Sequence, residues 1–199
     1  MRKISLYQCQ MECLRNLRCL AFFYNNVNRL CILHETTFKY TTPLKSETGW
    51  KFYENQDGSG QCPSNDNFLF HREYNLCYSI NYAFPMDYDV MNASCQAKDA
   101  ELIKIRNEKI QNYTELVTAG APVAYISIQG TDNIYPNRSW SWDDGKLMTY
   151  FKWDIDANQP TGGGDHIVMS IHYQYEWYDF AMPSNTRCIY ICERRISKT

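Results

Sequence analysis

The sequence predicts an α+β protein built from two small disulfide-linked modules. Its composition, its apolar patterning and its cysteine spacing lead to this prediction. The 199 residues are 44% hydrophobic and 21% charged, which is the composition of a globular protein. Apolar residues recur with helical and with strand-like periods along the chain. The nine cysteines lie close together before residues 55–61 and far apart after them.

The boundary between the modules is predicted within this polar segment. Residues 55–61 contain two glycines and no side chain that a core would bury. We therefore expect a first module at 1–55, a linker at 56–61, a second module at 62–194 and a tail at 195–199.

The first module shows the pattern of a helix followed by a hairpin. Ser5 can cap a helix that carries Cys9 and Cys13 on one face, because these two residues are four apart. The predicted strands lie at 20–24, 30–33 and 49–54, with a turn at 25–28.

The second module mixes aromatic strands with two helices. The predicted elements are a hairpin around 68–71, helices at 87–99 and from about 108 onward, and strands at 123–128 and 187–193.

The cysteine content predicts an oxidising compartment, and hence a secreted or extracellular protein. A cytosolic zinc protein is the alternative, but it would show paired C-x2-C motifs, or one with a histidine pair, and the sequence has neither. N-glycosylation sequons at Asn92, Asn112 and Asn137 agree with secretion.

The start of the chain has two basic residues but no apolar stretch, so it is not a signal peptide. We therefore expect a fragment of a longer protein or an incomplete gene start. The longest apolar run, 20–24, is far too short to cross a membrane. Twenty basic and 22 acidic residues give a net charge of -2, and the basic residues are scattered, which argues against nucleic-acid binding.

No enzyme motif is present, because G-x-S-x-G, H-E-x-x-H and P-loop patterns are all missing from the sequence. His166 and His172, with Asp165 beside them, would place two imidazoles on one face of a strand. Zinc needs a third or fourth ligand, so we interpret this pair as structural or solvated. Residues 162–164 are interpreted as a flexible glycine loop. We predict no catalytic activity.

The first module carries the motif Cys9-x3-Cys13-x5-Cys19, followed by the segments 21–25, 31–33 and 49–53. This pattern, over residues 5–54, resembles the PAN/apple family. The resemblance implies a helix on an antiparallel sheet and the disulfides Cys9–Cys31 and Cys13–Cys19. It also implies binding of proteins or glycans without catalytic machinery. The cysteines of a third bridge are missing, and the first strand is cut short at Met1.

The second module carries a longer series of motifs in order. They are Cys62-Pro63, Cys77-Tyr78, the segments 95–105, 125–128, 140–145 and 150–153, Gln159-Pro160, Trp177-Tyr178-Asp179 and 191–193. This series resembles a long-form C-type lectin-like domain. The resemblance implies two helices, antiparallel sheets, a long loop region and the disulfides Cys62–Cys77 and Cys95–Cys192. The family's other bridge is missing, and His166 and Met182 stand about where its cysteines would be.

Cys188 is left without a partner by these pairings. Cys192 lies four residue steps further along the predicted strand, about 13 Å away, beyond the reach of about 7 Å for bridged Cα atoms. The alternatives are a free, partly buried thiol, which we favour, and an interchain bridge that would make a disulfide dimer.

The family resemblance places a calcium and sugar site in the long loop, at Gln159, Pro160, Thr161, Asp165, Trp177, Tyr178 and Asp179. Gln159 and Pro160 match the Q-P-D triplet that implies galactose, but Thr161 stands where its aspartate belongs. Tyr178 replaces the asparagine of W-N-D. Calcium takes about 6–8 oxygen ligands, several of them carboxylates, so we expect weak or absent calcium binding and no other cofactor.

Under this interpretation Pro160 serves a tight turn, for which a cis peptide is one option, and Trp177 and Asp179 serve packing and loop hydrogen bonding. The alternative keeps Gln159, Asp165 and Asp179 as weak calcium ligands. Further oxygens would then come from Asp156 and Asn158.

The predicted function is extracellular recognition of a glycan or a protein, without calcium. Tyr173, Tyr175 and Tyr178 are candidates for stacking on a sugar or a protein partner, or else they form an ordinary tyrosine-rich strand. The alternatives are a calcium-dependent galactose-type lectin and an interaction module of a larger secreted or cell-surface protein that binds no sugar.

Overall fold

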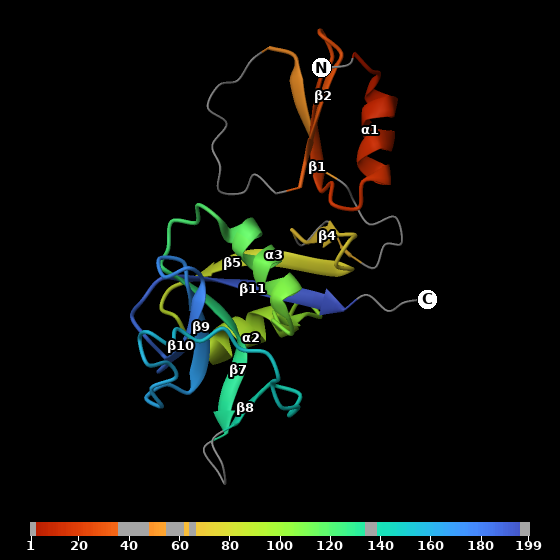
Figure 1. Ribbon diagram of the computed structural model, residues 1–199. Helices are drawn as coiled ribbons and strands as arrows, with labels where there is room; N and C mark the ends of the chain where they lie inside the picture. The colour runs from red at the N-terminus through yellow and green to blue at the C-terminus, as the bar shows by residue number, and fades with distance from the viewer. Residues whose placement is uncertain (1–2, 36–47, 55–61, 64–66, 134–138, 196–199) are drawn as a thin grey trace. The chain divides into compact units, whose positions relative to one another are not determined.

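The computed structural model describes residues 3–35, 48–54, 62–63, 67–133 and 139–195 (Figure 1). The chain forms two compact units. The first contains 1–77, 116–120 and 195–199, and the second contains 78–115 and 121–194. Helices and mostly antiparallel strands confirm the α+β class. The predicted linker at 56–61 lies outside the described residues, so the proposed domain division stays a prediction.

Helix α1 (Leu6–Arg15) opens the first unit, and its start follows from the cap expected at Ser5. The Ser5 hydroxyl accepts from the Gln8 N–H at 3.2 Å, and the Gln8 side-chain oxygen accepts from the Ser5 N–H at 2.8 Å. This reciprocal pair satisfies main-chain donors that the first helical turn leaves open. Strand β1 (Ala21–Asn25) lies between β2 (Leu30–His34) and β3 (Trp50–Glu54), with both pairings antiparallel.

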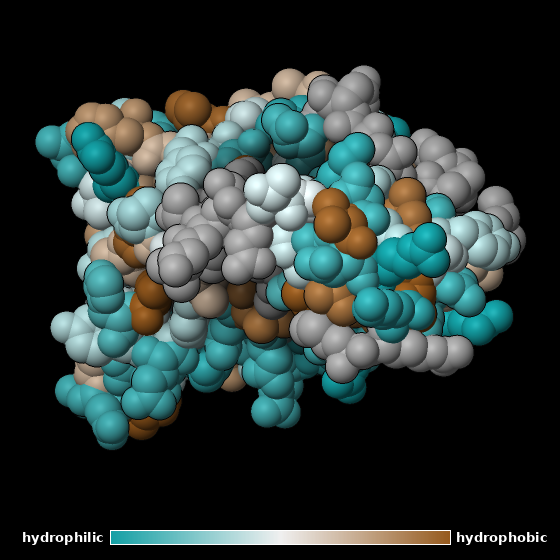
Figure 2. All heavy atoms as spheres, turned by 90° about the horizontal axis from the view of Figure 1, so that it is seen from above, coloured by the Kyte–Doolittle hydropathy of each residue, from teal (hydrophilic) through white to brown (hydrophobic). Residues whose placement is uncertain are grey.

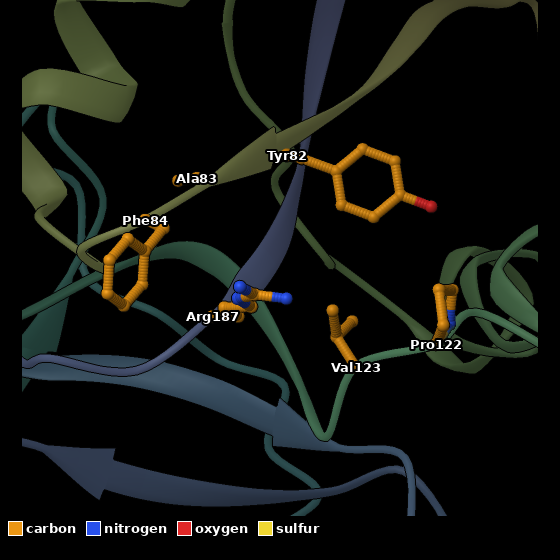
Figure 3. A pocket seen from close by; sticks show the side chains of 6 residues that line it. All are labelled: Tyr82, Ala83, Phe84, Pro122, Val123 and Arg187. Carbon is orange, nitrogen blue, oxygen red and sulfur yellow. The ribbon is translucent and has the colours of Figure 1, made fainter.

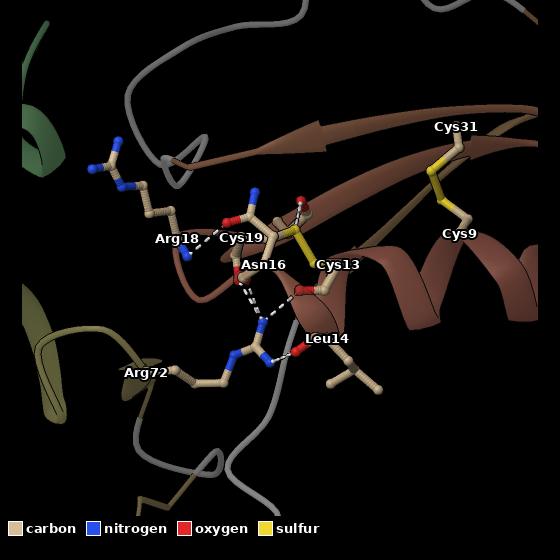
Figure 4. The surroundings of a disulfide bond; sticks show 9 residues. Cys9, Cys13, Leu14, Asn16, Arg18, Cys19, Cys31 and Arg72 are labelled. Atoms are coloured by element: carbon tan, nitrogen blue, oxygen red, sulfur yellow. Dashed lines mark hydrogen bonds between the residues drawn. A yellow bond between two sulfur atoms is a disulfide. The ribbon is translucent and has the colours of Figure 1, made fainter. Parts of the chain in front are cut away.

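The helix is fastened to this sheet by the disulfide Cys9–Cys31, and Cys13–Cys19 closes the loop after it. Figure 4 shows both bonds, and it shows the Arg72 guanidinium near Cys13 and Cys19, facing the carboxyl end of α1. Arg72 donates to the carbonyl oxygens of Cys13 at 2.6 Å and Leu14. A cation at this end of a helix complements the helix dipole and satisfies carbonyls that the last turn leaves open.

The second sheet has the strand order β10-β9-β7-β11-β5-β4. Strands β7 and β11 run parallel, whereas β9 is antiparallel to both of its neighbours. Two short strands pair with inner strands of this sheet, β6 with β11 and β8 with β7. The bounds are β4 Leu69–His71, β5 Leu76–Ala83, β6 Glu101–Leu102, β7 Tyr125–Asn133, β8 Ser139–Ser141, β9 His166–Ser170, β10 Glu176–Phe180 and β11 Cys188–Arg195. The helices are α2 Tyr88–Gln96 and α3 Glu108–Thr118.

The core of the second unit is formed by the inward faces of these strands. Ile126, Ile167 and Ile189 on β7, β9 and β11 have no exposed surface. The disulfide Cys95–Cys192 joins α2 to β11, and Cys62–Cys77 closes a loop in the first unit. The four bonds in the structure are the four pairs that the family resemblances imply.

A buried ion-pair network lies at the edge of this core. Lys104 is 1% exposed, and its ammonium lies 2.6 Å from a Glu101 oxygen and 3.4 Å from an Asp144 oxygen. The Arg106 guanidinium lies 2.6 Å from a Glu193 oxygen. The two buried charges of this network, Lys104 and Glu193, therefore each have a partner of opposite sign.

The structure corrects two expectations about strands. β9 ends at Ser170, and His172 lies exposed in the turn that follows, so His166 and His172 do not share a strand face. Tyr173 and Tyr175 lie in the same turn, and only Tyr178 is on β10. Gln174 and Tyr175 adopt the left-handed conformation, with φ of 51° and 56°, which ends strand geometry there.

Two of the three predicted sequons fall on helices. Asn92 on α2 is partly buried, and its amide nitrogen donates to an Asp143 oxygen at 3.1 Å. Asn112 on α3 is exposed, and Asn137 lies outside the described residues.

On the face drawn in Figure 2, the coloured hydrophobic residues occur in small groups among polar ones, as on most protein surfaces.

Candidate ligand-binding site

The candidate site is the long loop 154–165 together with the β9–β10 hairpin, and Trp177 on β10 holds the two together. The Trp177 side chain is fully buried, and its indole N–H donates to the Gln111 side-chain oxygen at 2.9 Å. Its main-chain N–H donates to the Lys152 carbonyl at 2.7 Å, and its carbonyl accepts from the Asp154 N–H at 3.2 Å. The ring also meets Trp153 edge to face, at 5.9 Å between centroids.

Asp179 lies two residues further along β10, and its carboxylate is surrounded by donors from the loop. It accepts from the main-chain N–H groups of Thr161 at 2.8 Å, Gly162 at 2.6 Å and Gly164 at 3.0 Å. The Thr161 hydroxyl adds a fourth donor, 2.9 Å from one oxygen and 3.1 Å from the other. Successive N–H groups that converge on an anion form a main-chain nest.

These contacts keep Asp179 ionised. Burial works against the charge, but the hydrogen bonds from Gly164, Thr161 and Gly162 outweigh it, so the pKa of Asp179 lies below its usual value. The side chain is only 8% exposed. Its negative charge is therefore stabilised by the dipoles of the loop.

Gln159 completes the contact from the other side of Pro160. The Gln159–Pro160 peptide is cis, in agreement with the tight turn expected there. The Gln159 side-chain oxygen accepts from the Asp179 N–H at 3.0 Å. The oxygens of Gln159 and Asp179 thus serve the contact between loop and strand, which is the role that the structural interpretation expects for Asp179.

Gly164 allows the loop to approach the strand this closely. A Cβ atom on Gly164 would lie 2.1 Å from the Phe180 nitrogen and 2.4 Å from the Asp179 carbonyl carbon, both main-chain atoms. No side chain fits there, because real Cβ contacts do not fall below about 3 Å. Residues 162–164 therefore pack closely against β10 as part of the Asp179 contact, and they are not the flexible loop that their composition suggests.

The Tyr178 hydroxyl takes part in a second contact, which engages it with a side chain of the loop rather than with a metal. Its hydroxyl donates to an Asp154 oxygen, and burial together with this bond raises the pKa of Tyr178. The Tyr173 ring lies 6.0 Å from the Tyr178 ring and is 60% exposed. Tyr173, Tyr178 and the exposed Ile155 thus give this part of the loop region an aromatic and apolar character.

The remaining predicted ligands lie apart from the Asp179 contact. Asp165 accepts from the Met182 N–H at 3.3 Å and lies 3.8 Å from the His166 imidazole. His166 stacks on Tyr88 with 3.9 Å between ring centroids. Asp156 and Asn158 are exposed. Within the described ranges no three His, Cys, Asp or Glu side chains are grouped as a metal site would need.

Sequence reasoning missed three participants in this site. Thr161 was expected only as a lost ligand, whereas its hydroxyl and N–H both bind Asp179. Asp154 and Gln111 carried no motif, although they anchor Tyr178 and Trp177. The run of three glycines before a strand was the one available signal that a main chain had to approach another closely.

Comparison with known protein families identifies the two domains of the chain. The PAN domain model matches residues 1–57, and the lectin C-type domain model matches 85–194, which is more than half of the chain. The chain therefore belongs to the C-type lectin family, with a PAN domain preceding the lectin domain. Both predicted resemblances are confirmed.

Curated relatives include lymphocyte antigen 75 of Homo sapiens, 25% identical over 85% of this chain and 10% of that protein. C-type mannose receptor 2 of Mus musculus is 28% identical over 74% of this chain and 10% of that protein. The chain thus spans about a tenth of the length of these relatives. These relatives are named as an antigen and a receptor, and their match supports a binding or recognition role for the lectin domain.

Solved structures show the same fold. The Ca2+-independent C-type lectin SPL-2 from Saxidomus purpuratus superposes with a TM-score of 0.59, over 72% of this chain and 100% of that one, at 22% identity. Human lithostathine has a TM-score of 0.56, over 72% and 99%, at 16% identity. In the described part of the chain, no helix has both the length and the apolar character that a membrane crossing needs.

Proposed function

We propose that the chain is an extracellular recognition protein whose lectin domain binds a glycan or protein ligand without calcium and performs no catalysis. The observation that carries this proposal is that hydrogen bonds from the loop already engage the Asp179 carboxylate. Both of its oxygens accept from the loop's N–H and hydroxyl donors. A calcium ion bound there would have to displace these donors, whose positive ends point at the same oxygens.

The relatives support an extracellular or cell-surface location, which agrees with four disulfides in the chain. SPL-2, which shares the fold, is named a Ca2+-independent lectin. The ligand would contact the aromatic surface formed by Tyr173 and Tyr178, because exposed aromatic rings stack on sugar faces and serve as anchors in protein interfaces.

A glycan array probed with the full chain, in calcium and again in EDTA, tests this proposal. Binding that EDTA leaves unchanged supports calcium-free glycan recognition. Galactose binding that EDTA abolishes would instead support the calcium-dependent lectin. If no glycan binds in either buffer, the result favours the other alternative, an interaction module of a larger secreted or cell-surface protein that binds no sugar.

Matched tyrosine variants locate the surface. Tyr173→Ser removes an exposed ring beside Tyr178 and should reduce glycan binding about tenfold, which corresponds to about 1.4 kcal/mol for one lost aromatic contact. Tyr7→Ser removes a 69% exposed ring from α1 and should leave binding unchanged. Equal binding by both variants and the unaltered chain would contradict the proposed surface.

Calcium itself gives a second measurement. We expect millimolar calcium to leave the melting temperature almost unchanged, whereas a ligand present at about 100 times its Kd would add about 2.7 kcal/mol to the stability. A large rise that Asp179→Ala abolishes would favour the calcium-dependent alternative.

A further inference from the structure

The second unit contains a pocket of about 430 Å³ built from elements that take no part in the Asp179 contact. Its lining comes from the end of β5, from the segment before β7 and from the residue before β11. The lining residues are Tyr82, Ala83, Phe84, Pro122, Val123 and Arg187. Figure 3 shows these side chains around the hollow, with Arg187 between Phe84 and Val123. The volume lies within the range of about 300–1,000 Å³ that is usual for ligand pockets.

The walls are apolar and aromatic, and much of this aromatic surface faces solvent. Phe84 is 61% exposed and Tyr82 is 51% exposed. Pro122 is exposed and Val123 is partly buried. Large exposed rings beside a hollow are unusual on a surface that has no partner, because their burial would be favourable.

Arg187 gives the pocket a positive charge. Its guanidinium carbon lies 5.7 Å from the centre of the Phe84 ring, which is a cation–π contact that holds the side chain over the pocket. Arg187 is exposed and forms no ion pair with any carboxylate among the described residues. None of the six lining residues is acidic. The charge-assisted hydrogen bonds of this guanidinium are therefore available to a ligand.

We propose that this pocket is a second recognition site, which takes an aromatic or large aliphatic side chain flanked by a glutamate or aspartate of an extracellular protein partner. The apolar side chain would fill the hollow between Tyr82, Phe84 and Val123, and the carboxylate would pair with Arg187. Tyrosine, phenylalanine and arginine at the rim have the composition of an interface centre. Charge complementarity selects an acidic partner over a neutral or basic one.

Peptide titrations of the 15N-labelled full chain, followed by NMR, test the site. The probes are acetyl-Gly-Phe-Glu-Gly-amide and its neutral counterpart acetyl-Gly-Phe-Gln-Gly-amide, each added to about 10 mM, because so few contacts give only millimolar affinity. The glutamate peptide should shift the amides at 82–84, 123 and 187. It should bind about fivefold more tightly than the glutamine peptide, as expected for one exposed ion pair.

Two charge variants decide the role of Arg187. Arg187→Gln should remove the preference for the glutamate peptide. Lys51→Gln removes the same charge from an exposed position on β3 and should retain the preference. The proposal is overturned if neither peptide shifts the pocket amides, if both peptides bind equally, or if Arg187→Gln keeps the preference. Concentration-dependent shifts of the same amides without peptide would also overturn it and assign the pocket to a second copy of the chain.

Discussion

At the scale of single residues, Asp179 shows how one carboxylate can serve two different purposes in one fold. In a calcium-binding arrangement it would face a cation, but in this chain it faces three N–H groups and a hydroxyl. We predict that Asp179→Asn destabilises the second unit by about 3 kcal/mol, because an amide NH2 would oppose N–H donors. Urea unfolding measures this loss, and it should be the same in calcium and in EDTA. Asp156→Asn, at an exposed carboxylate, is the control.

The same residue predicts a pH dependence. Because the folded-state pKa of Asp179 is lowered, its contribution to stability is fully present above the unfolded pKa of about 3.9 and is lost as the pH falls through the folded value. The difference in stability between the unaltered chain and Asp179→Asn should therefore be constant from pH 7 to pH 5 and shrink below about pH 4. A difference that stays constant to pH 2 would contradict the hydrogen-bonded, ionised carboxylate.

Cys188 predicts a chemical reactivity. Its thiol has no exposed surface and lies 3.6 Å from the Met91 sulfur, and burial raises the pKa of Cys188 to about 12. We expect no alkylation by iodoacetamide in the native protein at pH 8 and complete alkylation in denaturant, measured by intact mass. Val90→Cys, at a 63% exposed position on α2, should react in the native state. A dimer that reduction dissolves would restore the interchain alternative.

At the scale of elements, the contact between the loop and β10 depends on Gly164. We predict that Gly164→Ala costs at least about 2 kcal/mol, because the added Cβ would meet main-chain atoms that cannot move independently. The neighbouring Gly163→Ala is the matched control, since its Cβ would come no closer than 3.5 Å to another atom, the Thr161 hydroxyl oxygen. Urea midpoints compare the two variants. Equal midpoints would show that the loop does not pack on the strand as described.

The elements themselves were predictable where a local rule decides them. The α1 start at Leu6 follows from the Ser5 cap, and the hairpin of β1 and β2 follows from two apolar runs around an asparagine-rich turn. The expected strand through His172 was wrong, because alternation of side chains does not reveal the turn that follows Ser170, in which Gln174 and Tyr175 are left-handed.

The candidate site was predictable only in part, for a physical reason. The motif residues Gln159 and Asp179 do meet, because the family pattern fixes their places on the loop and on β10. What each oxygen binds depends on the course of the main chain. The donors from Gly162 and Gly164 are main-chain N–H groups, so no pattern of side chains predicts which atoms they bind.

At the scale of the whole molecule, the disulfides predict how the two units unfold. Cys9–Cys31 closes 22 residues in the first unit, and Cys95–Cys192 closes 97 residues in the second. In the chain-entropy model these loops are worth about 3 and about 5 kcal/mol. If the PAN and lectin domains are separate folding units, as we propose, each bond should stabilise only its own unit.

We therefore predict that replacing Cys95 and Cys192 by alanine lowers the urea midpoint of tryptophan fluorescence. The measurement uses a Trp50→Phe background, because Trp50 belongs to the first unit, whereas the other four tryptophans, Trp140, Trp142, Trp153 and Trp177, belong to the second. Replacing Cys9 and Cys31 should leave that midpoint unchanged, while hydrogen exchange of the β1–β3 amides becomes faster. The first replacement should conversely leave exchange in β1–β3 unaffected, because the bond that it removes constrains no residue of that sheet. If both replacements lower the fluorescence midpoint equally, the chain unfolds as one cooperative domain. The boundary predicted at 56–61 would then have no thermodynamic meaning.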